Sequence, residues 1–164
     1  MKDAMKVVPA AEPVQTGVQK VKPVAKALAE ALADTYRLVF KTHAYHWNVE
    51  GPLFYPIHKL TEAQYENLFA ATDEIAERIR ALGQLAPARL SEVIEASVIK
   101  DAEKLPSTQA MVEDLASDHE KVAKRLHDAI SLADEHEDPV TADMLTARSA
   151  FHEQAAWMLR ATAK

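Results

Sequence analysis

Glycine and proline, the residues that most often end helices, interrupt none of the long periodic segments of this chain. One segment runs from Pro23 to about residue 48, and a second runs from residue 54 to Leu82. A third begins after Pro106 and a fourth at Pro139. This spacing predicts four long helices, with one long connection between the second and the third. The three glycines are Gly17, Gly51 and Gly83, and the eight prolines are Pro9, Pro13, Pro23, Pro52, Pro56, Pro87, Pro106 and Pro139.

Each long segment carries apolar residues at helical spacing, which predicts one buried face per helix. Gly83 is a candidate for the residue after the second helix, Ser107 or Thr108 for the N-cap of the third, and residues 89–97 for a short helix in the connection. No stretch alternates as a strand would, and no repeat is present. The pattern predicts an all-α, ferritin-like four-helix bundle with a short helix in its long crossover. The predicted buried faces are Leu28, Leu32, Val39, His43 and His46; Ile57, Leu68, Ile75, Ile79 and Leu82; Met111, Leu115, Val122, Leu126 and Ala129; and Leu145, His152, Ala156 and Leu159.

Metal-ligand side chains recur on one face of the segment 54–83, within an arc of about 100°. They form two i,i+4 pairs, His58 with Glu62 and Asp73 with Glu77. The pairs are roughly 16 Å apart along a helix axis, whereas metal–ligand bonds to nitrogen and oxygen are about 2 Å long. One helix cannot bring both pairs to one ion, but two antiparallel copies related by a two-fold axis can. The spacing therefore predicts a dimer with metal sites shared between subunits. His46, in the motif His-x-x-His-Trp-Asn, is a further candidate ligand of these sites.

A simpler interpretation of each pair alone is an exposed helix face with ordinary i,i+4 contacts. The face lies about 140° from the apolar stripe and so points out of its own bundle, yet it includes Phe69. Asp73 and Glu77 repel each other unless a cation compensates, and Arg78 and Arg80 are candidates for that role. If this interpretation holds, the protein is an inert helical assembly, and the face that carries the potential metal ligands is only a contact surface between subunits. Because no histidine has a glutamate three residues before it, a di-iron site inside the bundle is not expected.

Composition narrows the possible functions. The 164 residues suit one domain with a substantial core, and without cysteine a metal site must use nitrogen and oxygen ligands. No apolar run approaches the roughly 20 residues of a membrane span, so we expect a cytoplasmic protein with no membrane partner. The net charge is −6, distributed as +2 over residues 1–22 and −8 over residues 23–164. An acidic body favours the capture of cations over nucleic acid.

Two stretches resemble the Dps family, the DNA-binding proteins from starved cells. They are His-Ala-Tyr-His-Trp-Asn-Val-Glu-Gly-Pro-Leu-Phe-Tyr-Pro-Ile-His at 43–58 and Thr-Asp-Glu-Ile-Ala-Glu-Arg-Ile-Arg-Ala-Leu-Gly at 72–83. Thr-Ala-Asp-Met-Leu-Thr at 141–146 and Ala-Trp-Met-Leu at 156–159 are also similar to that family, so the resemblance runs from about residue 23 to the C-terminus. It implies a hollow dodecamer, built from two-fold dimers, that oxidises Fe²⁺, stores ferric iron and protects DNA from oxidative damage. The family usually uses hydrogen peroxide, but nothing in the residues distinguishes peroxide from dioxygen.

The resemblance also implies roles for particular residues. Glu62 stands where the family often has aspartate, and its longer reach leaves direct ligation open. Trp47 is expected near the iron site, either as an electron donor or as a packed side chain. His43 is either an outer partner that orients a ligand or a core histidine. The implied ferroxidase ligands are His46, His58 and Glu62 from one subunit, with Asp73 and Glu77 from its two-fold mate.

Three acidic residues near the start of the fourth predicted helix resemble those that line the three-fold pores of the family, through which iron would enter. They are Asp134, Asp138 and Asp143, and Pro139 stands where some relatives have a further acid. A solvated acidic loop is the alternative. Of the remaining histidines, His119, His127 and His136 lie on polar stretches, where a histidine usually has no functional role. We expect His152 and Trp157 to be structural.

The segment 1–22 is predicted to be a flexible tail that precedes the bundle domain, residues 23–164. Its four lysines favour weak, non-specific DNA binding, which a multimer would strengthen and the acidic body would oppose. The alternative function is a nucleoid protein that compacts DNA with this tail. The lysines are Lys2, Lys6, Lys20 and Lys22.

Overall fold

The computed structural model describes residues 4–12 and 14–164, so Lys2, Asp3 and Pro13 of the predicted tail lie outside the described residues. The described residues form helices and loops without a strand. None of their helices is long and apolar enough to cross a membrane. The elements are a 3-10 turn at Ala4–Lys6 and the helices α1 (Val21–Asn48), α2 (Phe54–Ala81), α3 (Leu90–Ala96), α4 (Thr108–Glu135) and α5 (Pro139–Thr162).

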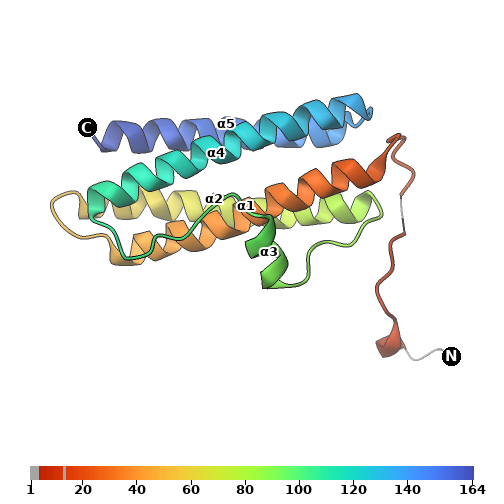
Figure 1. Ribbon diagram of the computed structural model, residues 1–164, viewed down its shortest axis with the longest axis horizontal. Helices are drawn as coiled ribbons and strands as arrows, with labels where there is room; N and C mark the ends of the chain where they lie inside the picture. The colour runs from red at the N-terminus through yellow and green to blue at the C-terminus, as the bar shows by residue number, and fades with distance from the viewer. Residues whose placement is uncertain (1–3, 13) are drawn as a thin grey trace.

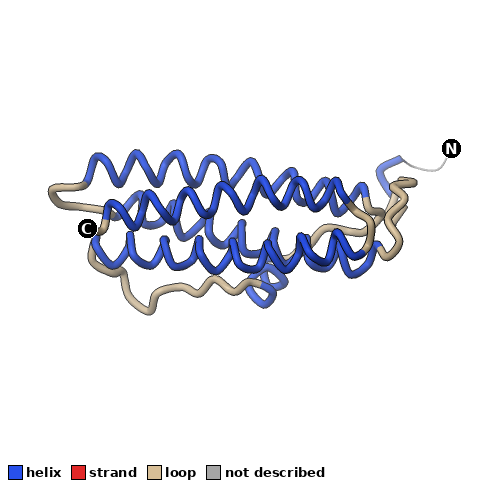
Figure 2. The backbone as a smooth tube through the Cα atoms, turned by 90° about the horizontal axis from the view of Figure 1, so that it is seen from above, coloured by secondary structure: helices blue, strands red, loops and turns tan. Residues whose placement is uncertain are grey.

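The four long helices form two antiparallel pairs, α1 with α2 and α4 with α5 (Figure 1). A long crossover joins α2 to α4 and carries α3, which packs against α1. Seen from above, the crossover runs along the bundle from one end to the other (Figure 2). The all-α, ferritin-like topology predicted from the glycine and proline spacing is confirmed.

The core lies between the four predicted apolar faces. The largest fully buried side chains include Leu28, Leu68, Leu115 and Leu145, one from each long helix. Each such leucine contributes about 1.5–3 kcal/mol relative to an exposed side chain. Only Val39 and His43 of the predicted buried faces remain partly exposed.

Helix ends follow local sequence signals. The Ser107 hydroxyl accepts a hydrogen bond from the Ala110 N–H and caps α4. Gly83 has φ +73°, and its N–H and that of Gln84 close the end of α2 on the carbonyls of Arg80 and Ile79, a Schellman motif. Helix α1 begins at Val21, so Pro23 lies in its first turn. Proline is tolerated there because the N–H groups of the first turn have no helical partner, and its missing N–H costs no hydrogen bond.

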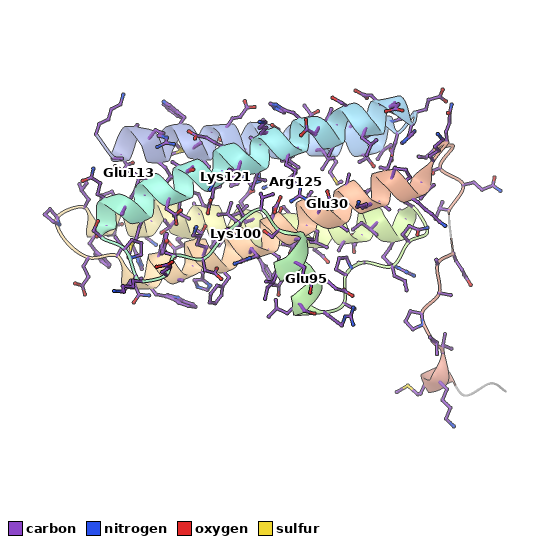
Figure 3. The ribbon with its side chains drawn as sticks, viewed as in Figure 1. Glu30, Glu95, Lys100, Glu113, Lys121 and Arg125 are labelled. Atoms are coloured by element: carbon purple, nitrogen blue, oxygen red, sulfur yellow. The ribbon has the colours of Figure 1, made fainter. Side chains whose placement is uncertain are left out.

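Buried ion pairs tie the crossover and α1 to α4. The Asp34 carboxylate accepts the Val98 N–H at 2.7 Å and the Arg125 guanidinium at 3.0 Å. Burial raises the pKa of Asp34. Arg125 on α4 also reaches Glu30 on α1 at 3.0 Å, and the two face each other across the helix pair (Figure 3). These contacts hold the long crossover against the bundle.

Candidate metal centre

His46 and His58 come together where α1 ends and α2 begins. The Nδ1 of His46 lies 2.9 Å from the His58 carbonyl oxygen, and the Nδ1 of His58 lies 3.0 Å from the His46 carbonyl oxygen. A carbonyl only accepts, so in both rings Nδ1 carries the hydrogen and donates it. For a neutral imidazole this leaves the Nε2 lone pair free, which is the form that binds a metal ion.

The end of α1 makes this arrangement possible. Since α1 ends at Asn48, the His46 carbonyl lies in the last turn, where carbonyls have no helical partner. Gly51, with φ +102°, turns the chain so that α2 returns beside α1. The two imidazole rings stack with centroids 3.7 Å apart. The sequence pattern identified the two histidines but did not predict their reciprocal hydrogen bonds. The signal in the sequence was the helix break at Gly51, which implies that the end of the first helix and the start of the second lie close together.

Glu62 lies one turn after His58 and pairs with the ammonium of Lys59. This hydrogen bond holds the pKa of Glu62 below its usual range. The carboxylate is therefore ionised and already bound to a cation. A metal ion that uses Glu62 has to displace Lys59 or share the carboxylate with it.

Aromatic rings surround the two histidines. His43 stacks on Tyr65 with centroids 4.2 Å apart and lies 4.1 Å from the Trp47 ring. Its ring centroid is 6.0 Å from that of His46, and the described residues include no hydrogen bond between these two side chains. Of the two roles considered for His43, packing therefore has the stronger support. The Trp47 side chain is 58% exposed, so one subunit alone does not bury it.

Asp73 and Glu77 are exposed on the same face of α2, further along the helix. The two neighbouring arginines do not compensate their charge. Arg78 donates to Asp138 at 2.6 Å, and Arg80 donates to backbone carbonyls. Among the described residues, neither carboxylate has an ion-pair partner.

No three potential ligand side chains of the described residues lie close enough within one chain to hold a metal ion. The structure thus brings His46 and His58 together, with Glu62 beside them, and leaves Asp73 and Glu77 apart. A complete site requires a second copy of the chain, which is the arrangement predicted from the helix spacing. The assembly itself stays a prediction.

The outer face around these ligands is unusually apolar for a solvated surface. Phe69 is 61% exposed and lies between the two carboxylate-bearing turns of α2. A groove of about 870 Å³ runs between α1, α2 and α3, and its lining includes Asp73, Phe69 and Tyr36. An apolar patch of this kind marks a site of protein contact. Other large apolar side chains exposed on α1, α2 and α3 include Phe40, Trp47, Phe54, Tyr55 and Leu90.

The acids predicted for pores divide into two kinds. Asp134 and Asp143 are exposed, but Asp138 is buried. The Asp138 carboxylate caps α5 through the Thr141 N–H at 2.9 Å and pairs with Arg78. The interpretation of Asp138 as a pore acid is therefore wrong for this subunit, because the residue before Pro139 serves as the helix N-cap.

The remaining histidines divide into buried and exposed residues. His119 and His136 lie on polar stretches of the sequence but are buried, and His119 bonds to His152 inside the bundle. His127 is exposed and contacts Glu153. Trp157 was expected to be structural but is 67% exposed.

Residues 25–164 match the family model described as the ferritin-like domain. Together with the bundle topology, this defines the chain as a ferritin-like protein. The Dps protein of Bacillus brevis has a similar solved structure, with a TM-score of 0.85 and 35% identity over 88% of this chain and 97% of that one. The Dps protein of Vibrio cholerae, described as a member of a broad superfamily of ferritin-like diiron-carboxylate proteins, has a TM-score of 0.83 and 28% identity over 88% of this chain and 91% of that one.

Sequence relatives agree with this class. DNA protection during starvation protein 2 of Bacillus anthracis is 36% identical over 140 residues, which cover 85% of this chain and 96% of that protein. An uncharacterized low temperature-induced protein of Nostoc sp. is 42% identical over 135 residues, which cover 81% of this chain and 75% of that protein. The chain belongs to the Dps family.

Proposed function

We propose that the protein is a ferroxidase and iron-storage protein of the Dps family, with Fe²⁺ oxidised at sites shared between two-fold-related subunits. The observation that carries the proposal is the split ligand set on α1 and α2. His46 and His58 present free Nε2 atoms at one level of the helix pair, while Asp73 and Glu77 lie uncompensated at another. An antiparallel second copy would bring these complementary halves together.

The residues suit iron as a substrate. Neutral imidazole and carboxylate bind Fe²⁺, and the anionic ligands favour the ferric state. Two Fe²⁺ ions release two electrons, which one hydrogen peroxide molecule accepts, with two protons, to become two water molecules. The site would therefore consume peroxide and Fe²⁺ together and limit hydroxyl-radical formation. Trp47, which lies beside the histidines and is exposed in the single subunit, would meet the partner or supply an electron.

The assembly we propose is a hollow dodecamer built from two-fold dimers, with ferric iron stored inside. The exposed aromatic face supports the two-fold contact. Support for a role in DNA protection comes from relatives named for it, in Bacillus anthracis and Brevibacillus brevis. Exposed Asp134 and Asp143 are the candidates for guiding iron to a pore.

An anaerobic Fe²⁺ titration followed by addition of peroxide or dioxygen tests the proposal. We expect about two Fe²⁺ per shared site, fast oxidation on adding peroxide, and a particle of twelve subunits by light scattering. Slow oxidation no faster than Fe²⁺ in buffer would instead favour an inert assembly. Comparing the two oxidants at equal concentration decides which one the protein prefers.

DNA compaction by the N-terminal segment is the second candidate function. Three of its four lysines, Lys6, Lys20 and Lys22, have exposed side chains. The body that follows is acidic and repels phosphate. We therefore propose weak, sequence-independent DNA binding as secondary to the iron chemistry.

A further inference from the structure

A group of polar side chains lies inside the bundle, away from the candidate metal centre. We call Gln64, His119, Arg148 and His152 the polar layer. Their side chains are buried, and several of their polar atoms have no hydrogen-bond partner. These atoms are Nε2 of both histidines, the amide nitrogen and oxygen of Gln64, and Nε and Nη2 of Arg148. Buried polar groups are normally satisfied by protein, by ordered water or by a ligand.

Helical position brings these residues to one level. Gln64 lies ten residues after the start of α2, His119 eleven after the start of α4, and His152 ten before the end of α5. These helix ends meet at the same end of the bundle (Figure 1). At 1.5 Å per residue, all three lie roughly 15 Å from that end. Arg148 stands one turn before His152 on the same face of α5.

The two histidines can be assigned complementary tautomers. Burial lowers the pKa of His119 to about 3 and that of His152 well below its usual value, so both rings are neutral at pH 7. Their Nδ1 atoms are 2.9 Å apart, which requires one to donate and the other to accept. The remaining ring atoms are therefore one Nε2–H donor and one Nε2 acceptor. Because the Nδ1 atoms face each other, the Nε2 atoms point apart and cannot chelate one cation.

Arg148 adds a positive charge that no carboxylate of the described residues contacts directly. Its Nη1 donates to the Asn67 side-chain oxygen at 2.7 Å, and its Cζ lies 4.5 Å from the Phe151 ring centroid. No carboxylate among the described residues lies within ion-pair distance of it, although the negative charge of Glu74 acts on the guanidinium and raises its pKa, against the larger effect of burial. Burial lowers its pKa, yet a guanidinium stays protonated in proteins. A buried cation without a direct ion-pair partner is costly, and water would satisfy its free N–H groups without adding a compensating charge.

We propose that the polar layer binds a small monovalent inorganic anion of halide or nitrate size. The free Nε–H and Nη2–H groups of Arg148 supply charge-assisted donors, and the Nε2–H of the histidine pair and the Gln64 amide add neutral ones. The positive charge of Arg148 excludes a metal cation from the same place. The site is separate from the ferroxidase ligands and does not depend on the proposed function.

Bromide is a direct probe, because its anomalous scattering distinguishes it from water. The full oligomer should be crystallised with sodium bromide as the only small-anion salt. We expect an anomalous peak within hydrogen-bonding distance of Arg148 Nε or Nη2 in every subunit. Water at that position, or a carboxylate of a neighbouring subunit paired with Arg148, would overturn the proposal.

Thermal unfolding gives a second measurement in solution. An anion that binds only the folded state raises the melting temperature with its concentration. At constant ionic strength, replacing gluconate by bromide should raise the melting temperature of the wild-type protein by several degrees, and this rise should be lost in Arg148→Met. Arg160→Met is the matched control, because Arg160 is an exposed arginine paired with Glu120. An equal rise in Arg148→Met would contradict the site, and if that variant does not fold, the bromide crystal decides.

Discussion

The imidazole of His46 and that of His58 are each held by the backbone of the other residue, since each Nδ1 donates to the other residue's carbonyl oxygen, at 2.9 and 3.0 Å. In most metal sites a third residue orients the ligating histidine. Here the backbone of each ligand candidate orients the other, and the bonds also tie the last turn of α1 to the second turn of α2. Losing either side chain removes only the hydrogen bond that its own ring donates, because the carbonyl that orients the other ring belongs to the backbone.

The first prediction concerns the sharing of sites between subunits. His58→Ala and Asp73→Ala should each abolish fast Fe²⁺ oxidation and leave the oligomer intact. Mixing the two variants after reversible dissociation should restore activity, because a mixed dimer has one site lacking both ligands and one complete site. With random pairing, about a quarter of the wild-type rate is expected.

The control for mixing uses two variants from the same half-site. His58→Ala mixed with His46→Ala should restore nothing, because every site then lacks at least one histidine. Stopped-flow absorbance of ferric iron measures both mixtures. Full activity in either single variant, or equal recovery in both mixtures, would contradict the shared site.

The second prediction concerns stability. Asp138→Ala removes the cap of α5 and the buried carboxylate that pairs with the half-buried Arg78. Breaking a buried pair in this way costs about 3–5 kcal/mol. Glu120→Ala breaks the exposed pair with Arg160 and should cost less than about 1 kcal/mol. Urea unfolding compares the two variants, and similar losses would show that the Asp138 interactions matter little.

A third prediction addresses iron entry. The double variant Asp134→Asn with Asp143→Asn should slow iron uptake at low ionic strength by up to about tenfold, because the acids would no longer concentrate cations. High salt should remove the difference. Glu95→Gln with Glu113→Gln removes the same charge from exposed positions elsewhere (Figure 3). Equal uptake by both double variants would favour a solvated acidic loop.

The fourth prediction is a pH dependence of stability. The pKa of His119 falls from 6.5 to about 3 on folding, and that of His152 also falls. The unfolded chain therefore binds more protons than the folded one in this range, so stability is present above pH 6.5 and is lost as the pH falls toward 3. The loss should approach about 1.4 kcal/mol per pH unit for each histidine. In His119→Leu with His152→Leu, urea midpoints without halide should vary less over this range, and an unchanged slope would refute the assignment.

The fifth prediction concerns DNA. Binding should be weak, independent of sequence and absent near physiological salt, because each lysine that neutralises a phosphate contributes about 0.9 to the log–log salt slope. Replacing Lys2, Lys6, Lys20 and Lys22 by glutamine should remove it. Gel shifts across a salt titration measure both effects, with Lys26→Gln and Lys121→Gln as controls on the bundle. Tight binding at physiological salt, or binding by the glutamine variant, would contradict this role.

The positions of the helices could be predicted because their signals are local. Gly83 and Ser107 end and begin helices through contacts with residues a few positions away, and the apolar stripes record which face each helix buries. The rise of 1.5 Å per residue along a helix placed the His58 pair and the Asp73 pair too far apart to bind one ion. It therefore predicted that one chain holds only half of each metal site. Periodicity and capping are properties of short segments, so the sequence by itself determined them.

Contacts between distant segments were decided only by the tertiary structure. Asp138 looked like a surface acid, but the approach of Arg78, 60 positions away, makes it a buried cap. His119 lies among polar neighbours in sequence, yet α5 brings His152 to it and creates an unsatisfied polar layer inside the bundle. No local pattern encodes these pairs, because burial and hydrogen bonding depend on how the helices pack together, and that packing is set by the whole core.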